Sequence, residues 1–169
     1  VLSTFCGVHQ KQEAIMTKPH ENIVLEPVAE SEFCNVFSAT KQALKLHVEP
    51  VYGWDDEYQY HRLTTEYQHS WYYWVTYRNQ RVGLICFKPY DQAFHIHLLI
   101  IFPDHQKKKL GFKVINHIHQ LAAEANRNLI TLSSFKSNKS AIGFYSSLGY
   151  QITDSGDENF VSMACEIAS

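Results

Sequence analysis

The sequence predicts an α/β (α+β) fold in which a mixed, mostly antiparallel central sheet is flanked by about four helices. Two observations support this class. Segments rich in aromatic and β-branched residues alternate along the chain with segments whose apolar residues recur at helical spacing. Two strand-like segments in the middle of the chain are separated only by a short turn, whereas later strands are separated by helices. We therefore expect an antiparallel half followed by a β-α-β-α-β half.

The first predicted strand covers residues 22–28 and is followed by an amphipathic helix that Ser31 can cap. Pro50 and Gly53 should end this helix, because proline lacks a backbone donor and glycine favours turns. The helix should pack on the sheet through a face that carries apolar residues at helical spacing, namely Phe33, Val36, Phe37 and Leu44.

A second helix should start at a cap formed by Asp55 or Asp56 and run to about His69. Residues 71–77 and 81–87 are aromatic and β-branched and should pair as a hairpin. The remaining predicted elements follow in order: a strand over 94–102, a helix over 111–125, a strand over 128–135, a helix over 140–148 that Gly149 ends, and strands over 150–153 and 160–167.

Composition limits the function classes. A chain of 169 residues suits one domain, which we expect over residues 22–169. Residues 1–21 should form an N-terminal extension without fixed structure, in which Met16 could be the true translation start. A net charge of −2 argues against a nucleic-acid partner, and no apolar run reaches the roughly 20 residues of a membrane span. The four scattered cysteines favour reduced thiols and a cytoplasmic protein.

One candidate anion site precedes the helix over 111–125. The segment from Ile100 to Gly111 reads IIFPDHQKKKLG, which is a strand end, a Pro-Asp turn and a lysine-rich entry into a helix. A helix N-terminus offers unpaired N–H groups and a partial positive charge, and Lys107, Lys108 and Lys109 add cations there. This arrangement suits a phosphate group. The alternative is an ordinary solvated lysine run on the surface.

A second motif, NKSAIGFYSSLGY, runs from Asn138 to Tyr150. Together the two motifs resemble the GNAT acyltransferase superfamily over residues 95–150. The family pattern is P-x-x-Q/R-x-x-G-x-G/A at the start of a helix, then a strand, then N-x-x-A-x-x-[FL]-Y-x-x-x-G-[FY]. The chain departs from the pattern at Lys107 and Lys109, where the family often has glycine, which lets the backbone approach a phosphate closely.

The resemblance implies a GNAT-like fold and an N-acetyltransferase that uses acetyl-CoA as co-substrate and needs no metal. It implies that the loop backbone holds the coenzyme A pyrophosphate and that the strand edge before the loop pairs with the pantetheine arm. It also implies that Asn138 contacts the cofactor and that Tyr145 lies beside its sulfur. The cofactor-binding residues predicted in this way are Leu99, Ile100, Ile101, Gln106, Lys107, Lys108, Lys109, Leu110, Gly111, Asn138 and Tyr145.

Two kinds of side chain are candidate catalysts. Tyr145 could be an aromatic core residue, but a phenol near a departing thiolate can also donate the proton that the thiolate needs. His95 and His97 alternate on one face of their strand, so they could share a pocket in which His97 relays the amine proton and His95 contacts the substrate. They could equally be two partly buried structural histidines. A zinc site is not supported, because no third ligand stands at suitable spacing.

Trp54, Asp56 and Tyr58 are the candidate acceptor-binding residues, because the resembling fold places their segment over the acceptor side and acidic and aromatic groups suit a cationic amine. The alternative for the start of this segment is a helix cap with a packed tryptophan. The sequence does not decide whether the acceptor is a small molecule or a peptide. It also leaves open whether the protein forms a homodimer. The rival function is a non-catalytic acyl-CoA-binding or interaction module with the same fold.

Overall fold

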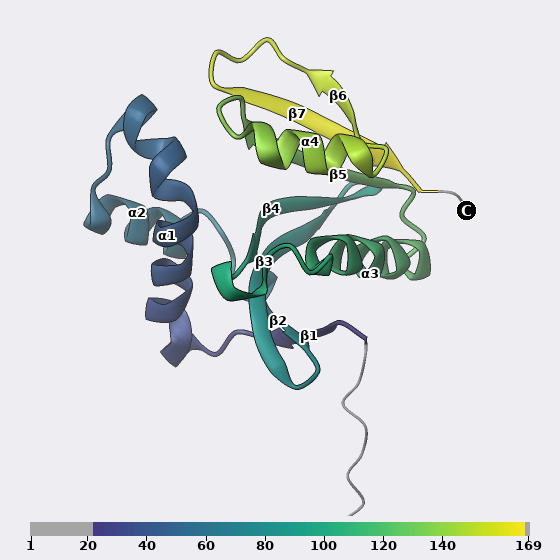
Figure 1. Cartoon of the computed structure of the whole chain (residues 1–169), viewed down its shortest axis with the longest axis horizontal. Helices are drawn as coiled ribbons and strands as arrows, with labels where there is room; N and C mark the ends of the chain where they lie inside the picture. The colour runs from purple at the N-terminus through teal and green to yellow at the C-terminus, as the bar shows by residue number, and fades with distance from the viewer. Residues whose placement is uncertain (1–21, 168–169) are drawn as a thin grey trace, which may run out of the picture.

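The computed structural model describes residues 22–167. The predictions for residues 1–21 and Met16 therefore lie outside the described residues. The described part contains a seven-stranded sheet in the order β1-β2-β3-β4-β5-β7-β6, with four α-helices packed on its two faces (Figure 1). All neighbouring strands are antiparallel except β4 and β5, which are parallel. The predicted mixed α/β fold is confirmed.

The first strand, β1 (Val24–Pro27), lies at one sheet edge, and a short 3-10 turn leads into α1 (Phe33–Tyr52). The prediction that Ser31 caps this helix is wrong, because Ser31 lies inside the 3-10 turn. Pro50 does not end the helix either, since it removes a bond only to the carbonyl of Leu46, a residue that is 76% exposed to water. Gly53 does end it, with a φ of 71°.

Helix α2 (Asp56–Thr65) follows, and Asp55 is its cap, accepting a 2.7 Å hydrogen bond from the backbone N–H of Tyr58. The helix ends before the predicted His69, which lies in a separate 3-10 turn. The expected hairpin is β2 (Tyr72–Tyr77) and β3 (Gln80–Tyr90), joined by a two-residue turn in which both residues have positive φ.

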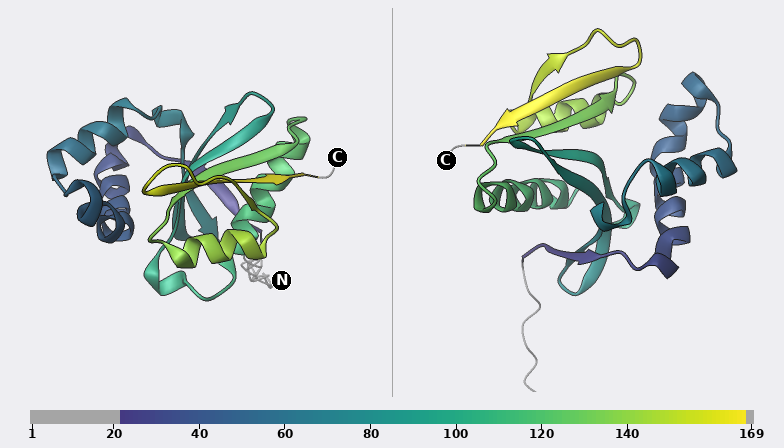
Figure 2. Two further views of the ribbon diagram at one scale, coloured as in Figure 1. Left: turned by 90° about the horizontal axis from the view of Figure 1, so that it is seen from above. Right: turned by 180° about the vertical axis from the view of Figure 1, so that it is seen from behind.

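The second half alternates strands and helices as predicted. Its elements are β4 (Ala93–Ile101), α3 (Leu110–Glu124), β5 (Leu129–Phe135), α4 (Lys139–Ser147), β6 (Gln151–Asp154) and β7 (Phe160–Glu166). Helices α3 and α4 pack on one face of the sheet and α1 and α2 lie on the other side (Figure 2). Gly149 follows the end of α4 with a φ of 90°, in the position that the sequence predicts.

The sheet is interrupted where β4 and β5 meet. Their parallel pairing ends at Ile96 and Leu132, so the remainder of β4 has no strand partner on that side within the described residues. Against β3, β4 pairs Ile96 with Phe87 and then Leu98 with Cys86, which leaves His97 as the extra residue of a β-bulge. The bulge changes which side chains after His97 point to each face of the sheet. It lies next to Ile96, where the parallel pairing of β4 with β5 ends.

Candidate active site

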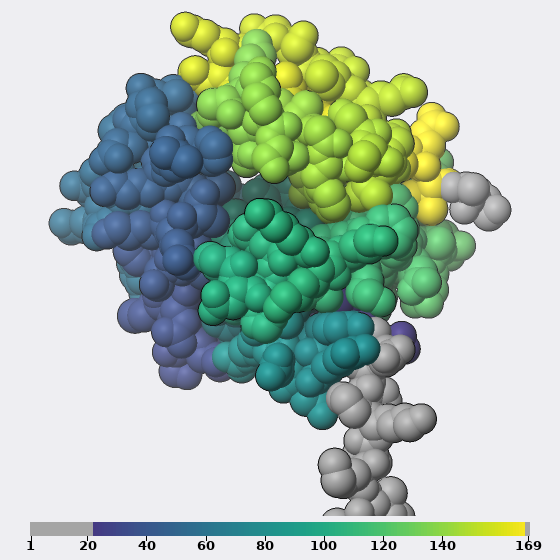
Figure 3. Space-filling view, viewed as in Figure 1, coloured from purple at the N-terminus to yellow at the C-terminus, as the bar shows by residue number. Residues whose placement is uncertain are grey.

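Two cavities meet at the gap between β4 and β5. The narrower one, of about 220 Å³, lies between the sheet and helices α1 and α2. The wider one, of about 790 Å³, lies along β4, the first turn of α3 and the length of α4. Figure 3 shows the molecule hollowed between the blue helices and the green segments. Four residues line both cavities: Leu99, Asn138, Ala141 and Tyr145. A molecule in one cavity would therefore touch a molecule in the other at this point.

The loop before α3 forms one end of the wider cavity. Lys107 and Lys109 line it, and both have left-handed backbone angles, with φ of 60° and 59°. These are the positions where the family pattern often has glycine, which adopts such angles without steric cost. Lys108 is not among the lining residues, because its ammonium donates a 2.7 Å hydrogen bond to the carbonyl of Asp104. The loop thus directs two of its three lysines to the cavity.

The first turn of α3 presents backbone N–H groups to the same cavity. Lys109 is its N-cap residue and forms no side-chain cap hydrogen bond, and Leu110 and Gly111 line the cavity. A Cβ atom at Gly111 would lie 3.1 Å from the ring of Phe144, so glycine allows α3 and α4 to approach closely. The N-terminal end of α3 can therefore hold an anion.

The free edge of β4 forms the wall of the wider cavity. The side chains of Leu99 and Ile101 line it. Gln106 also lines it and donates a 2.9 Å hydrogen bond to the carbonyl of Ile101. The side chain of Ile100 is buried instead in the cluster on the opposite face, with Phe33 and Trp74, so only its backbone can take part in binding.

Helix α4 supplies the two polar residues at the meeting point. Asn138 caps the helix, its Oδ1 accepting a 3.1 Å hydrogen bond from the N–H of Ala141. Tyr145 is 8% exposed and packs edge-on against Phe144 and Tyr150. Burial raises the pKa of the Tyr145 phenol above its ordinary value, so it carries its proton at neutral pH. A protonated phenol therefore lies at the junction of the cavities.

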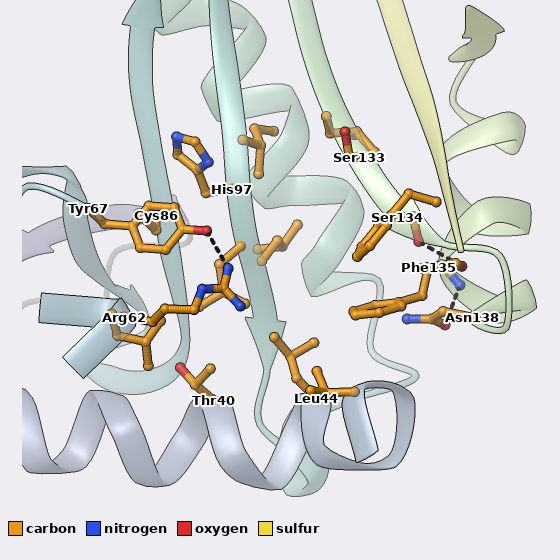
Figure 4. Close-up of a pocket in the computed structure, with 18 of the residues that line it drawn as sticks. Thr40, Leu44, Arg62, Tyr67, Cys86, His97, Ser133, Ser134, Phe135 and Asn138 are labelled. Atoms are coloured by element: carbon orange, nitrogen blue, oxygen red, sulfur yellow. Dashed lines mark hydrogen bonds between the residues drawn. The ribbon is translucent and has the colours of Figure 1, made fainter. Parts of the chain in front are cut away.

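His97 lies in the narrower cavity, on the bulge of β4 (Figure 4). Its ring stacks on Trp71 at 5.6 Å between centroids and meets Tyr67 edge-on at 4.8 Å. Its Nε2 is buried without a hydrogen-bond partner in the described part of the chain. Burial, with smaller contributions from His95 and Lys88, lowers the pKa of His97 to about 4. The imidazole is therefore neutral at pH 7.

His95 lies beside His97, with 4.7 Å between the ring centroids, as the alternation predicts. It does not line the narrower cavity, and its Nδ1 is 2.8 Å from the hydroxyl of Thr131 on β5. Burial lowers the pKa of His95 as well. These contacts place the His95 ring against Thr131 of β5, outside the lining of the narrower cavity.

The segment 54–58, which enters the first turn of α2, contributes less to the narrower cavity than the sequence suggests. Trp54 lines it, but Asp56 and Tyr58 do not, and Tyr58 is 60% exposed. The carboxylate of Asp56 accepts 2.6 Å hydrogen bonds from the indole of Trp54 and from the ammonium of Lys41. Asp56 therefore orients Trp54 and is already neutralised by a lysine.

Sequence reasoning missed several polar residues of the narrower cavity, among them Arg62, Tyr67, Ser133 and Ser134. Arg62 donates from Nε to Glu66 at 2.9 Å and from Nη2 to the Tyr67 hydroxyl at 3.4 Å. One signal could have identified it, because Gln59, Arg62 and Leu63 share one face of α2 at helical spacing and all three line the cavity. The two serines lie on β5, across the gap (Figure 4).

Among residues 22–167, no group of three or more His, Cys, Asp or Glu side chains is placed to hold a metal ion. Within the same residues, every helix is too short or too polar to span a bilayer.

The family is shown by sequence. Residues 36–150 match the model of the Acetyltransferase (GNAT) family, and the chain belongs to this family. No curated protein matches the chain significantly in sequence. The resemblance that the two motifs carry is therefore confirmed at the level of the family.

Solved structures agree with this fold at low sequence identity. Ard1 from Thermoplasma volcanium is 16% identical, with a TM-score of 0.65 and alignment over 87% of this chain and 99% of that one. PaiA N-acetyltransferase from Thermoplasma acidophilum, solved in complex with coenzyme A, is 13% identical, with a TM-score of 0.67 over 86% and 99%. The ribosomal-protein-S18-alanine N-acetyltransferase from Escherichia coli is 15% identical, with a TM-score of 0.63 over 87% and 95%.

Proposed function

We propose that this chain transfers the acetyl group of acetyl-CoA to a primary amine, by direct transfer while both substrates are bound. The observation that carries the proposal is the meeting of two cavities at the gap between β4 and β5, with Tyr145 lining both. Two substrates entering from opposite sides would meet beside a buried phenol. Membership of the GNAT family supports acetyl transfer in general, and a neighbour solved with coenzyme A supports use of that cofactor.

The wider cavity fits coenzyme A in two respects. Lys107 and Lys109 stand with the free N–H groups at the start of α3, where the phosphates would bind. The unpaired edge of β4 near Leu99 offers backbone groups that an extended pantetheine arm can pair with. Asn138 closes the cavity near the reacting end. No covalent enzyme intermediate is required, because the narrower cavity holds the attacking amine directly.

The chemistry divides between the two sides of the gap. The thioester supplies an activated acetyl group and a thiolate leaving group. We assign to Tyr145 the donation of a proton to that sulfur, and to a backbone N–H of β4 near the bulge the stabilisation of the oxygen during attack. A neutral amine is the nucleophile, and the attack is assisted by holding the reacting atoms together.

His97 is the proposed acceptor of the amine proton. Its neutral imidazole can accept a hydrogen bond from the amine, and a partner there would satisfy the buried Nε2. A pKa of about 4 makes it a weak base at pH 7, so it would assist an amine that is already neutral rather than deprotonate an ammonium ion.

The test is release of free thiol from acetyl-CoA in the presence of a panel of small amines and short peptides. We expect rapid release with a subset of amines and a product heavier by one acetyl group in mass spectrometry. Calorimetry with acetyl-CoA alone separates the rival, since a non-catalytic binding module would bind the cofactor and release thiol with none of the panel. That result would contradict the proposal.

A further inference from the structure

The charge of the narrower cavity does not suit an acceptor with several positive charges. Arg62 is the only lining residue with a full charge, and no carboxylate lines the cavity among the described residues. The nearest acidic candidate from the sequence, Asp56, lies outside it and is paired with Lys41. A cavity that held a dication would need carboxylates, because a buried charge without a partner is costly.

Arg62 is positioned to bind an anion. The carboxylate of Glu66 accepts a hydrogen bond from Nε of Arg62, and the Tyr67 hydroxyl lies 3.4 Å from Nη2. A guanidinium has five N–H donors in a fixed plane, so these two contacts leave donors on the Nη side for a ligand. In Figure 4 the Arg62 side chain reaches toward β4, with Tyr67 above it. Glu66 is not a lining residue, so it orients the guanidinium from behind without filling the cavity.

The interior of the narrower cavity is small. About 220 Å³ gives room for roughly seven groups the size of a water molecule. Much of the wall is apolar, including Leu44, Val48 and Leu98, while the hydroxyls of Ser133 and Ser134 stand on β5. The cavity therefore suits a short molecule with one polar end at Arg62 and the other at the gap.

We propose that the acetyl acceptor is a small primary amine that also carries an anionic oxygen group, a carboxylate or a phosphate, which Arg62 binds. This inference rests on the proposed acetyl transfer and names the substrate class of the same site. Arg62 is then the specificity-determining residue, and the Tyr67 hydroxyl can add a hydrogen bond to the same anion. Polyamines are disfavoured, which reverses the expectation that Asp56, at the start of α2, helps to select a cationic amine.

The first experiment uses the wild-type protein and pairs of amines that differ in charge alone. Glycine, alanine, β-alanine and 4-aminobutyrate are each compared with their amides, together with 2-aminoethyl phosphate and putrescine, at equal concentrations of neutral amine. We expect kcat/KM for at least one acid to exceed that of its amide by roughly 10- to 100-fold, the range for a hydrogen bond to a charged group. The phosphate arm distinguishes a phosphate-bearing acceptor from a carboxylate-bearing one. Amides or putrescine used as well as every anionic amine would overturn the inference and leave acetyl transfer standing.

The second experiment uses a matched pair of variants. Arg62→Gln should raise KM for the preferred anionic amine roughly 10- to 100-fold while leaving KM for acetyl-CoA unchanged, and it should abolish the preference for acid over amide. Glu66→Gln breaks the same ion pair but keeps the guanidinium, so it should change these values less than about threefold. Equal effects of the two variants would mean that the ion pair is structural and would contradict the role of Arg62.

A third measurement separates this inference from the proposed function. Calorimetric titration of the protein saturated with coenzyme A, using β-alanine and then β-alaninamide, detects the anion preference without turnover. Tighter binding of the acid would support the site even if no amine released thiol, a result that would contradict only the proposed acetyl transfer. Equal affinity of the two in a panel that covers all four acid and amide pairs would overturn the anion site.

Discussion

The two sides of the gap between β4 and β5 are built in different ways. The wider cavity, which is the proposed cofactor side, comes from two short segments, 105–112 and 138–148, together with the adjoining edge of β4, and it includes the N-terminal ends of two helices and a strand edge. The acceptor side takes single side chains from α1, α2, β4 and β5, which lie far apart in the chain. A ligand held by backbone requires a local sequence pattern, whereas a ligand held by scattered side chains does not. The family pattern therefore marks the first side only.

The largest expected effect is at Tyr145, where the two sides meet. Tyr145→Phe removes one oxygen and keeps the ring, so packing and acetyl-CoA affinity should change less than a few-fold. If the phenol is the general acid, kcat should fall roughly 10²- to 10⁴-fold. Steady-state rates with the best amine and calorimetry with acetyl-CoA measure the two effects.

Tyr150→Phe is the matched control for Tyr145→Phe. It removes the same atom from a neighbouring buried ring whose hydroxyl bonds His119 at 2.9 Å and which lines neither cavity. Its kcat should stay near the wild-type value. A Tyr145→Phe protein that turns over as fast as the control would leave protonation of the thiolate to water.

Most of the fold could be predicted from the sequence, because each strand and helix has its own periodicity and turn residues. The hairpin of β2 and β3 and the end of α4 at Gly149 are examples. The errors arose where a local signal competed with context. Ser31 has the chemistry of a cap, but the chain forms a 3-10 turn there and starts α1 later. Pro50 has the chemistry of a helix breaker, but it falls in the last turn.

The candidate site could be predicted only in part, for a related reason. Alternation along β4 places His95 and His97 together, but the bulge at His97 depends on pairing with β3 and changes which later side chains face each cavity. Arg62 was missed because its significance comes from what surrounds it, a cavity that no carboxylate lines among residues 22–167, and no motif contains it. Asp56 was predicted to contact the acceptor because it is acidic. Its carboxylate already accepts hydrogen bonds from Lys41 and Trp54.

The next largest effect tests whether the cofactor side depends on charge as well as backbone. Replacing Lys107 and Lys109 with alanine should weaken acetyl-CoA binding by roughly tenfold, because both cations line the cavity at a helix N-terminus. The loss should shrink in high salt, which screens the wild-type contacts. Lys108→Ala removes one positive charge from a side chain bonded to the carbonyl of Asp104 and should change affinity much less than Lys107→Ala or Lys109→Ala alone. Equal losses for the three single variants would mean that the loop acts through overall charge.

A smaller effect tests whether the acceptor side can be altered through a residue outside the cavity. Asp56→Asn weakens the hold on Lys41 and on the Trp54 indole, so KM for the amine should rise about two- to threefold while KM for acetyl-CoA stays constant. Glu57→Gln removes the same charge one residue later and should leave both constants unchanged. A change in KM for acetyl-CoA instead would move this segment to the cofactor side.

The smallest expected effect is on stability in acid. The comparison is between His97 on β4 and His119 on α3. The pKa of His97 is lowered to about 4 from its ordinary 6.5, and burial lowers that of His119 too. Between pH 6.5 and 4 the unfolded chain binds a proton at His97 that the folded protein does not, so the free energy of unfolding falls as the pH falls through this range. His97→Gln removes one such group and should reduce the fall in melting temperature between pH 7 and pH 5 by a few degrees at most, since the ring is only half-buried. His119→Gln should reduce it in the same direction, but only His97→Gln should also alter the pH dependence of kcat/KM for the amine. A His97→Gln protein whose melting temperature falls with pH as steeply as the wild type would show that the pKa of His97 in the folded protein is close to its ordinary value, and the lowered pKa of His97 would then be wrong.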